Sequence, residues 1–153
     1  MGLLGDYPHL VAEVGHLRWR EWGRAPEPTD PAFWVSVTGD EAGRVHLPVS
    51  WVAVAADGRA VGAVGLGEFD IDERRDRSPW VLGMIVHPDQ RRRGIGRLLL
   101  AALGDWAADR GWQRLWVATG GPAVRFYEDC GWENVESFAR ANGEMTTVLM
   151  KLL

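Results

Sequence analysis

The chain has 153 residues, of which 46% are hydrophobic and 25% are charged, and this balance suits one globular domain rather than a disordered segment. The formal net charge of −4 argues against a dedicated nucleic-acid-binding protein, which usually carries a basic surplus. The single cysteine, Cys130, excludes a disulfide framework, and no apolar run approaches the roughly 20 residues of a membrane span. We therefore expect a soluble, cytoplasmic protein that binds neither nucleic acid nor a membrane.

The N-terminal part of the sequence predicts two helices. Apolar residues recur at helical spacing over His9–Trp22, and Gly23 ends the pattern. A proline-rich loop follows. Asp30 is then suited to cap a short helix over Pro31–Val37, with proline at the first helical position.

The rest of the sequence predicts strands and helices in alternation. Asp57-Gly58 is a strong hairpin signal between two predicted strands, Val49–Ala56 and Ala60–Phe69. A near-continuous apolar strand, of the kind buried on both faces, precedes a leucine-rich helix. These two elements and those that follow are Trp80–Val86 (strand), Arg97–Arg110 (helix), Arg114–Thr119 (strand), Pro122–Cys130 (helix), and a strand pair, Trp132–Phe138 and Thr146–Leu152, joined at Asn142-Gly143. This order predicts a single mixed α/β domain over residues 1–153.

The strongest chemical signal lies between the apolar strand and its helix, in His87-Pro88-Asp89-Gln90-Arg91-Arg92-Arg93-Gly94-Ile95-Gly96. Unpaired amides at a helix start bind anions, and glycine lets the backbone approach phosphate. Three arginines add bidentate donors for phosphate oxygens. Two common phosphate motifs are excluded, because Leu99 stands where a dinucleotide fingerprint needs its third small residue and no P-loop pattern exists. On charge alone, a solvated arginine turn is an equally good interpretation.

The full pattern of this turn is more specific than its charge. Arg91-x-x-Gly94-x-Gly96, between an apolar strand and a leucine-rich helix, resembles the acetyl-coenzyme A signature of the GNAT superfamily of N-acetyltransferases. A second motif downstream, from Ala123 to Trp132, is similar to the family's short helix that carries a tyrosine before Gly and an aromatic residue. The resemblance covers roughly Val49–Leu152. It implies the GNAT fold, in which helices flank a mostly antiparallel central sheet with a splayed parallel strand pair.

The resemblance implies acetyl-coenzyme A as the co-substrate and assigns residues to it. Backbone groups of Met84, Ile85 and Val86 would line the pantetheine arm, and an amide near Met84 would face the acetyl carbonyl as an oxyanion donor. The turn would cradle the pyrophosphate through Arg91, Arg92, Arg93, Gly94, Ile95, Gly96 and Arg97, and Phe126 and Tyr127 complete the cofactor-binding set. No metal site is expected, because the four histidines show no ligand spacing.

The same resemblance implies catalytic roles. Tyr127 matches the family tyrosine whose hydroxyl lies near the departing sulfur, which makes it the candidate general acid; the alternative is a half-buried aromatic residue on a helix surface. Glu68 is the first candidate for the general base, with Asp70 and Asp72 as neighbouring alternatives, although exposed carboxylates are mostly just solvated. The chain departs from many relatives in having Thr119-Gly120-Gly121 where they have an asparagine that contacts the pantetheine.

Taken together, these features predict a monomeric or homodimeric enzyme that moves acetyl directly onto a primary amine. The acceptor would be a small molecule, such as an antibiotic-like amine, or a peptide amine, and the chain length mildly favours the small molecule. Trp19, Trp22 and Trp34 would be core residues or part of one wall of the acceptor site. A catalytically weak acyl-coenzyme A-binding module with a regulatory role is the alternative function.

Overall fold

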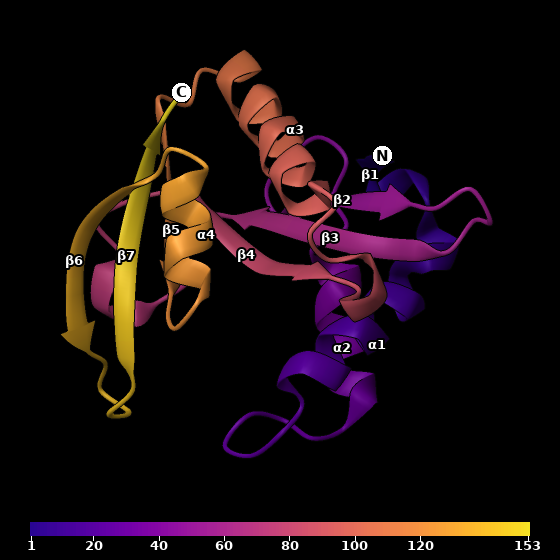
Figure 1. Ribbon diagram of the computed structural model, residues 1–153, viewed down its shortest axis with the longest axis horizontal. Coiled ribbons are helices and arrows are strands. Elements are labelled where there is room, and N and C mark those ends of the chain that lie inside the picture. Colours follow the sequence, from indigo (N-terminus) through magenta and orange to yellow (C-terminus); the bar gives the residue numbers. More distant parts are fainter. The chain divides into compact units, whose positions relative to one another are not determined.

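The computed structural model describes residues 1–153, which form seven strands and four α-helices (Figure 1). The strands form one sheet in the order β1-β2-β3-β4-β5-β7-β6, in which β4 and β5 run parallel with Trp80 opposite Trp116. The elements are β1 (Gly2–Leu3), α1 (Val11–Trp22), α2 (Pro31–Asp40), β2 (Val49–Val54), β3 (Ala60–Gly67), β4 (Trp80–Val86), α3 (Ile95–Asp109), β5 (Arg114–Thr119), α4 (Ala123–Asp129), β6 (Glu133–Ala139) and β7 (Met145–Leu152). This sheet confirms the predicted mixed α/β fold class with one parallel pair.

The chain divides into two compact units, each built from two segments. The first unit comprises Met1–Leu66 and Gly83–Leu103, and the second comprises Gly67–Leu82 and Gly104–Leu153. Three elements, β3, β4 and α3, therefore have residues in both units. The single-domain organisation over residues 1–153 stays a prediction.

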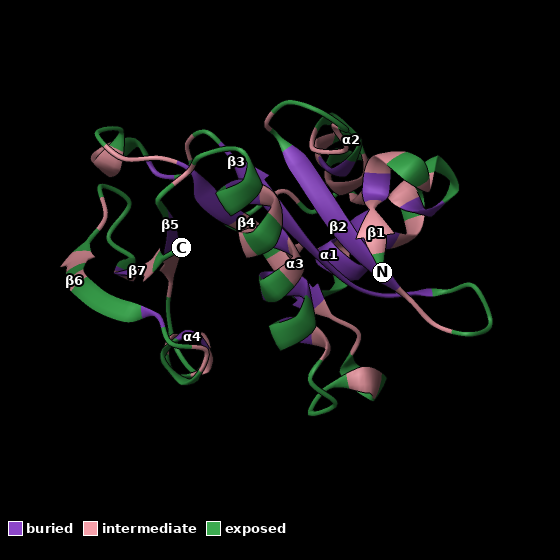
Figure 2. Cartoon of the chain, turned by 90° about the horizontal axis from the view of Figure 1, so that it is seen from above, coloured by how far each residue is buried: buried purple, intermediate pink, exposed green.

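In the first unit, helices cover both faces of the β2–β3 hairpin. Side chains of α1 and the turn before it pack with strand residues in a core that includes Leu10, Val14, Leu17, Val52, Ala60, Ala63 and Ile85. Gly62 faces the other side, because successive strand residues point to opposite faces, and a Cβ there would lie 3.2 Å from side-chain atoms of Ile95 and Leu99. The start of α3 therefore covers that face, and β2 is buried along most of its length (Figure 2).

The position of α2 is set by its cap and by a close contact with α1. Asp30 accepts a hydrogen bond from the amide of Ala32 at 2.9 Å, with Pro31 at the first helical position, as predicted. The helix continues to Asp40, three residues beyond the predicted end at Val37. A Cβ on Gly15 would lie 2.6 Å from the Cα of Val35, so this approach of the two helices requires glycine.

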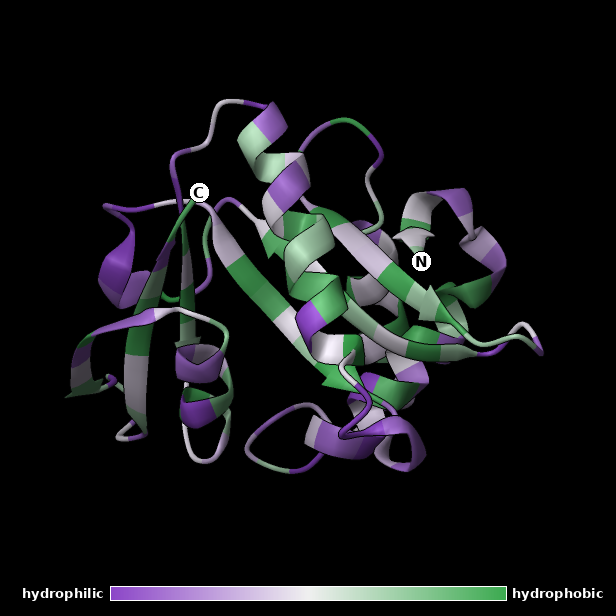
Figure 3. Cartoon of the chain, turned by 45° about the horizontal axis from the view of Figure 1, so that its top comes forward, coloured by the Kyte–Doolittle hydropathy of each residue, from purple (hydrophilic) through white to green (hydrophobic).

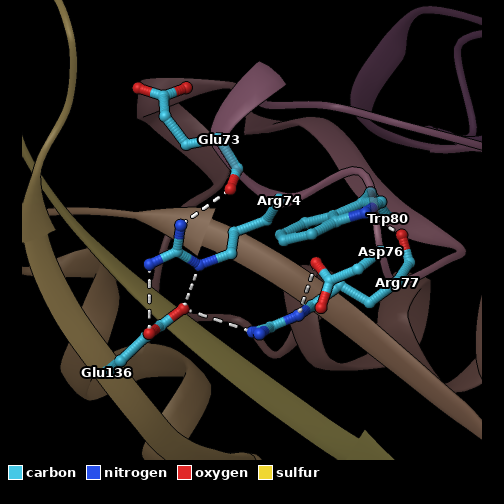
Figure 4. Close-up of polar contacts among 6 residues, drawn as sticks. All are labelled: Glu73, Arg74, Asp76, Arg77, Trp80 and Glu136. Atoms are coloured by element: carbon cyan, nitrogen blue, oxygen red, sulfur yellow. Dashed lines mark hydrogen bonds and ion pairs between the residues drawn. The ribbon is translucent and has the colours of Figure 1, made fainter.

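In the second unit, an aromatic core lies beneath a cluster of ion pairs. Trp80 and Trp116 pack with ring centroids 6.2 Å apart in a core that also contains Ile71 and Val148. The guanidinium of Arg77 lies 4.7 Å from the Trp116 ring, and its backbone carbonyl accepts from the Trp80 indole at 2.8 Å. Arg74 and Arg77 both donate to Glu136 of β6 (Figure 4). The charged segment before β4 is thereby tied to the sheet.

Besides the longer α2, the structure differs from the sequence-based expectation at several element bounds and in the burial of β4. The two-residue strand β1 was not predicted, because it is too short to show alternation. β3 ends at Gly67 rather than Phe69. The prediction that β4 is buried on both faces is wrong at its centre, where Gly83 is exposed and Met84 half-buried. Hydropathy alone misleads there, because β4 is hydrophobic along most of its length (Figure 3) while Gly83 interrupts the extended backbone with φ +52°.

No helix combines the length and the apolar character needed to cross a membrane.

The pairing of Glu73 with Arg140 in the second unit makes stability depend on pH. Arg140 donates to Glu73 at 3.1 Å and the amide of Ala141 donates to it at 3.0 Å. These hydrogen bonds, chiefly that from Arg140, lower the pKa of Glu73 from 4.5 to about 2. Because the pKa is lower in the folded protein, the pair stabilises the fold above the unfolded value of 4.5, and this contribution is lost as the pH falls towards 2.

We predict that Arg140→Met lowers the melting temperature by a few degrees near pH 7, and that the difference from the wild type shrinks towards about pH 2. Thermal unfolding followed by circular dichroism at both pH values measures this. Arg114→Met, which removes an exposed arginine from β5, serves as the control and should have little effect at either pH. A difference for Arg140→Met that does not vary with pH would contradict the prediction.

Candidate functional site

The first unit contains the predicted anion-binding turn between β4 and α3. Pro88–Gln90 form one 3₁₀ turn after the strand, and α3 begins at Ile95. The first helical hydrogen bond runs from the amide of Leu98 to the carbonyl of Gly94 at 3.0 Å. The amides of Gly94, Ile95 and Gly96 therefore precede the helical ladder and lie at the positive end of a 15-residue helix. This is the geometry that binds phosphate groups.

Two residues of this turn adopt left-handed backbone conformations. Gly94 has φ +78°, and a Cβ there would find no heavy atom within 4 Å, so the space in front of the helix start is open. Arg92 has φ +64°, which costs a residue with a side chain about 1–2 kcal/mol. Gly96, by contrast, is buried within the first turn of the helix.

The three arginines of the turn are exposed, and Arg91 is used within the protein. Its Nε donates to the carbonyl of Val86 at 3.1 Å, and its Nη2 lies 3.2 Å from a carboxylate oxygen of Glu21 on α1. Arg91 thus braces the turn against the end of β4 and against α1. Of the three arginines expected from the sequence, this arrangement makes Arg92 and Arg93 better candidates than Arg91 for phosphate contacts through their side chains.

The predicted pantetheine-lining residues come directly after Gly83, where the positive φ bends β4. Ile85 is 5% exposed and belongs to the core of the first unit, whereas Met84 and Val86 are half-buried. Gly83, directly before Met84, is exposed. Backbone groups are thus accessible at the centre of an otherwise apolar strand.

Tyr127 lies on α4 in the second unit and is more deeply buried than a residue on a helix surface. Its side chain is 3% exposed, and its ring meets those of Phe126 and Trp132 edge to face, with centroids 5.3 and 5.2 Å away. Burial raises the pKa of the Tyr127 phenol, and charge interactions with Cys130 and Asp70 raise it further. A tyrosine is protonated at neutral pH in any case, and the raised pKa makes the Tyr127 hydroxyl a weaker acid than an exposed one.

A cavity of about 230 Å³ in the second unit is bordered by Asp70 and by the end of β5. It is lined by Asp70, Ile71, Ala118, Thr119, Gly120, Arg140, Glu144, Met145 and Thr146. All three predicted base candidates are exposed, but Asp70 alone among them lines this cavity, and its charge also acts on Tyr127. Thr119 and Gly120, which replace the asparagine found in many relatives, border the same space.

The three N-terminal tryptophans are half-buried around the loop that joins α1 to α2. The indole of Trp19 donates to the carbonyl of Thr29 at 2.8 Å, and that of Trp34 donates to the carbonyl of Pro28 at 2.9 Å. The rings of Trp22 and Trp34 lie 6.2 Å apart. These residues organise the loop, and a contact with an acceptor stays a prediction.

Sequence reasoning missed Arg18, a charged residue that is 3% exposed on α1. The available signal was its place one turn after Val14, on the apolar face of the helix. No group of three or more His, Cys, Asp or Glu side chains is arranged to hold a metal ion.

Comparisons with known proteins agree with this geometry. The model of the acetyltransferase (GNAT) family matches residues 11–132. An aminoglycoside 6′-N-acetyltransferase solved with coenzyme A is similar with a TM-score of 0.76 at 15% identity, covering 95% of this chain and 91% of that chain. An aminoglycoside 6′-acetyltransferase type Ii has a TM-score of 0.74 at 20% identity, covering 99% and 95%. A nourseothricin acetyltransferase has a TM-score of 0.58 at 23% identity, covering 68% and 64%. No curated protein matches the sequence.

Proposed function

The chain belongs to the acetyltransferase (GNAT) family, and we propose that it transfers the acetyl group of acetyl-coenzyme A directly to a primary amine of a small, cationic molecule. Acetyl transfer from acetyl-coenzyme A is the activity of the family. The observation that carries the choice of acceptor is the cavity lined by Asp70 and Glu144, because their carboxylates attract a protonated amine while the lining arginine, Arg140, is paired with Glu73. The full-length likeness to two aminoglycoside acetyltransferases supports an antibiotic-like amine as the first acceptor to test.

The turn between β4 and α3 fits the pyrophosphate of the co-substrate. The amides from Gly94 to Arg97 would donate to phosphate oxygens, and Arg92 and Arg93 would add charge from the exposed side of the turn. Open space in front of Gly94 accommodates such a group without a shift of the backbone. For Met84 we propose that the backbone amide donates to the thioester carbonyl, where negative charge develops as the amine attacks.

The remaining chemistry needs a base and an acid. We propose that the carboxylate of Asp70 accepts the proton of the attacking amine, directly or through water, while the amine nitrogen bonds to the acetyl carbon. When the carbon–sulfur bond breaks, the hydroxyl of Tyr127 donates a proton to the departing thiolate. The hydroxyl carries that proton at neutral pH, as a tyrosine ordinarily does. Glu68 stays the alternative base.

The role of the turn can be tested with two matched variants of Gly94. Asp and Asn both tolerate a positive φ better than other residues with side chains, and the side chain would enter the open space in front of the helix. We predict that Gly94→Asp weakens coenzyme A binding by at least about tenfold, since a carboxylate repels phosphate, while Gly94→Asn weakens it less. Titration calorimetry measures both affinities. Equal affinities for the two variants would show that phosphate does not bind at this turn.

Thiol release from acetyl-coenzyme A with a panel of amines tests the activity itself. We predict release with aminoglycoside or streptothricin-like amines, and a fall in turnover of at least about tenfold for Tyr127→Phe, which keeps the ring and removes the proton donor. Coenzyme A affinity should change little in this variant. If the wild type binds coenzyme A but releases no thiol with any amine, the chain is a binding module instead.

Two carboxamide variants identify the base. We predict that Asp70→Asn lowers turnover about 10²- to 10⁴-fold, whereas Glu68→Gln has a much smaller effect, because Asp70 lines the cavity and Glu68 does not. The loss should shrink as the pH of the assay rises, since more of the acceptor amine is then already deprotonated. The reverse order of the two variants would assign the base to Glu68.

A further inference from the structure

A buried arginine holds the bend of β4 in the first unit. Arg18 of α1 is 3% exposed, and its Nε donates to the carbonyl of Gly83 at 3.1 Å. Its Nη1 donates to the hydroxyl of Thr38 at 3.1 Å and to the carboxylate of Glu41 at 3.2 Å. Its Nη2 is buried without a hydrogen-bond partner. One guanidinium therefore joins α1, the end of α2 and the centre of β4.

The contact between the two helices brings these groups together. Gly15 allows α1 to approach Val35 of α2, and Arg18 follows Gly15 by one helical turn. Thr38 and Glu41 follow Val35 at intervals of three residues, so their side chains lie on the same side of α2. The carboxylate of Glu41 supplies the countercharge that a buried guanidinium requires.

Gly83 is the residue of β4 that this contact demands. Its φ of +52° disfavours any residue with a side chain. A Cβ on Gly83 would also lie 2.9 Å from the Cζ, Nε and Nη2 atoms of Arg18. The guanidinium therefore packs directly against the glycine, whose own surface is exposed. The peptide that follows Gly83 thus lies at the boundary between a buried cation and the accessible side of the strand.

The geometry of the peptide group transmits this contact to the next residue. The carbonyl of Gly83 and the N–H of Met84 belong to one planar peptide, and this peptide is trans. In a trans peptide the two bonds point in opposite directions. Anchoring the carbonyl to Arg18 therefore directs the N–H of Met84 away from the buried cation. A charged donor on the carbonyl also polarises the peptide, which strengthens its N–H as a donor.

We propose that Arg18 is a positioning residue for acetyl transfer. Its hydrogen bond to the Gly83 carbonyl orients and polarises the Met84 amide, which donates to the thioester carbonyl oxygen. This inference rests on the proposed function, in which that amide is the oxyanion donor. Arg18 itself touches no substrate. Donors aimed in advance at developing charge are worth more than mobile ones, which explains why the fold accommodates a buried arginine at this place.

The test replaces the ion pair without leaving a lone buried charge. The double variant Arg18→Met, Glu41→Met exchanges the pair for apolar side chains, which is tolerated far better than removal of one partner. The control is Arg74→Met, Glu136→Met, which removes an arginine–glutamate pair that the proposed function does not use (Figure 4) and leaves Arg77 its pair with Asp76. Arg18→Lys is a second variant, in which a cation remains beside Glu41 but one nitrogen cannot span the acceptors at Gly83 and Glu41.

Infrared spectra of bound acetyl-coenzyme A, labelled with carbon-13 at the acetyl carbonyl, report on the Met84 amide directly, because a stronger hydrogen bond lowers the carbonyl stretching frequency. We expect the lowered frequency of the wild type to return towards the solution value in the Arg18→Met, Glu41→Met variant, and to stay lowered in the control. Turnover should fall about tenfold or more, while the affinity for acetyl-coenzyme A stays within about threefold. A frequency in this variant equal to that of the wild type overturns the proposal.

Two further outcomes separate this inference from the proposed function. If the double variant loses its native circular dichroism spectrum, Arg18→Lys decides the question, and a wild-type frequency in that variant overturns the positioning role. If the wild type itself fails to bind acetyl-coenzyme A in calorimetry, the proposed function falls and the positioning role falls with it. If the wild type binds acetyl-coenzyme A and the variant shows the same carbonyl frequency as the wild type, the positioning role is wrong and the proposed function stands.

Discussion

Burial of one positive charge constrains much of the first unit. A guanidinium taken out of water is costly unless its charge is paired and its N–H groups find acceptors. Arg18 meets most of that requirement with acceptors on two other elements, Glu41 beside α2 and Gly83 in β4. The packing of α1 on α2, the glycine in the strand and the bend at that glycine are therefore consequences of the same contact.

The turn after β4 presents its backbone donors at the start of α3, because the amides of His87, Asp89 and Gln90 before it are bonded within the protein. Beyond the bend, β4 ends at Val86, whose carbonyl accepts from Arg91, and the chain then enters α3 through Gly94. The side chain of Arg91 supports the turn, and those of Arg92 and Arg93 are exposed beside it. A backbone that presents its own amides can bind groups common to many substrates, such as phosphates and a carbonyl, while acceptor selectivity is left to side chains elsewhere.

The second unit supplies titratable groups whose environments differ. The phenol of Tyr127 is packed among aromatic rings, which keeps it protonated, whereas Asp70 borders a cavity and is exposed. This difference in surroundings fits the proposed roles, Tyr127 as the acid and Asp70 as the base. Hydrogen bonds from Arg140 to Glu73 and from Arg74 to Glu136 hold neighbouring segments of this unit in place. They have no part in the proposed reaction.

The sequence by itself determined the features that depend on neighbouring residues along the chain. The bounds of β4 and β5, the Asp30 cap, the glycine turn before α3 and the tyrosine of α4 all follow from local patterns that agree with the structure. Each is encoded within about ten residues, which is the range over which periodicity, caps and turn preferences act.

Only the tertiary structure decided which groups meet across long separations. The contact between Arg18 and Gly83 joins residues 65 positions apart, and nothing local marks either one as a partner of the other. The proposal of Asp70 rather than Glu68 as the base likewise rests on a cavity lined by β5 and the β6–β7 hairpin, far along the chain. Burial and pairing of charges are properties of the packed molecule, because they depend on which elements exclude water around a side chain.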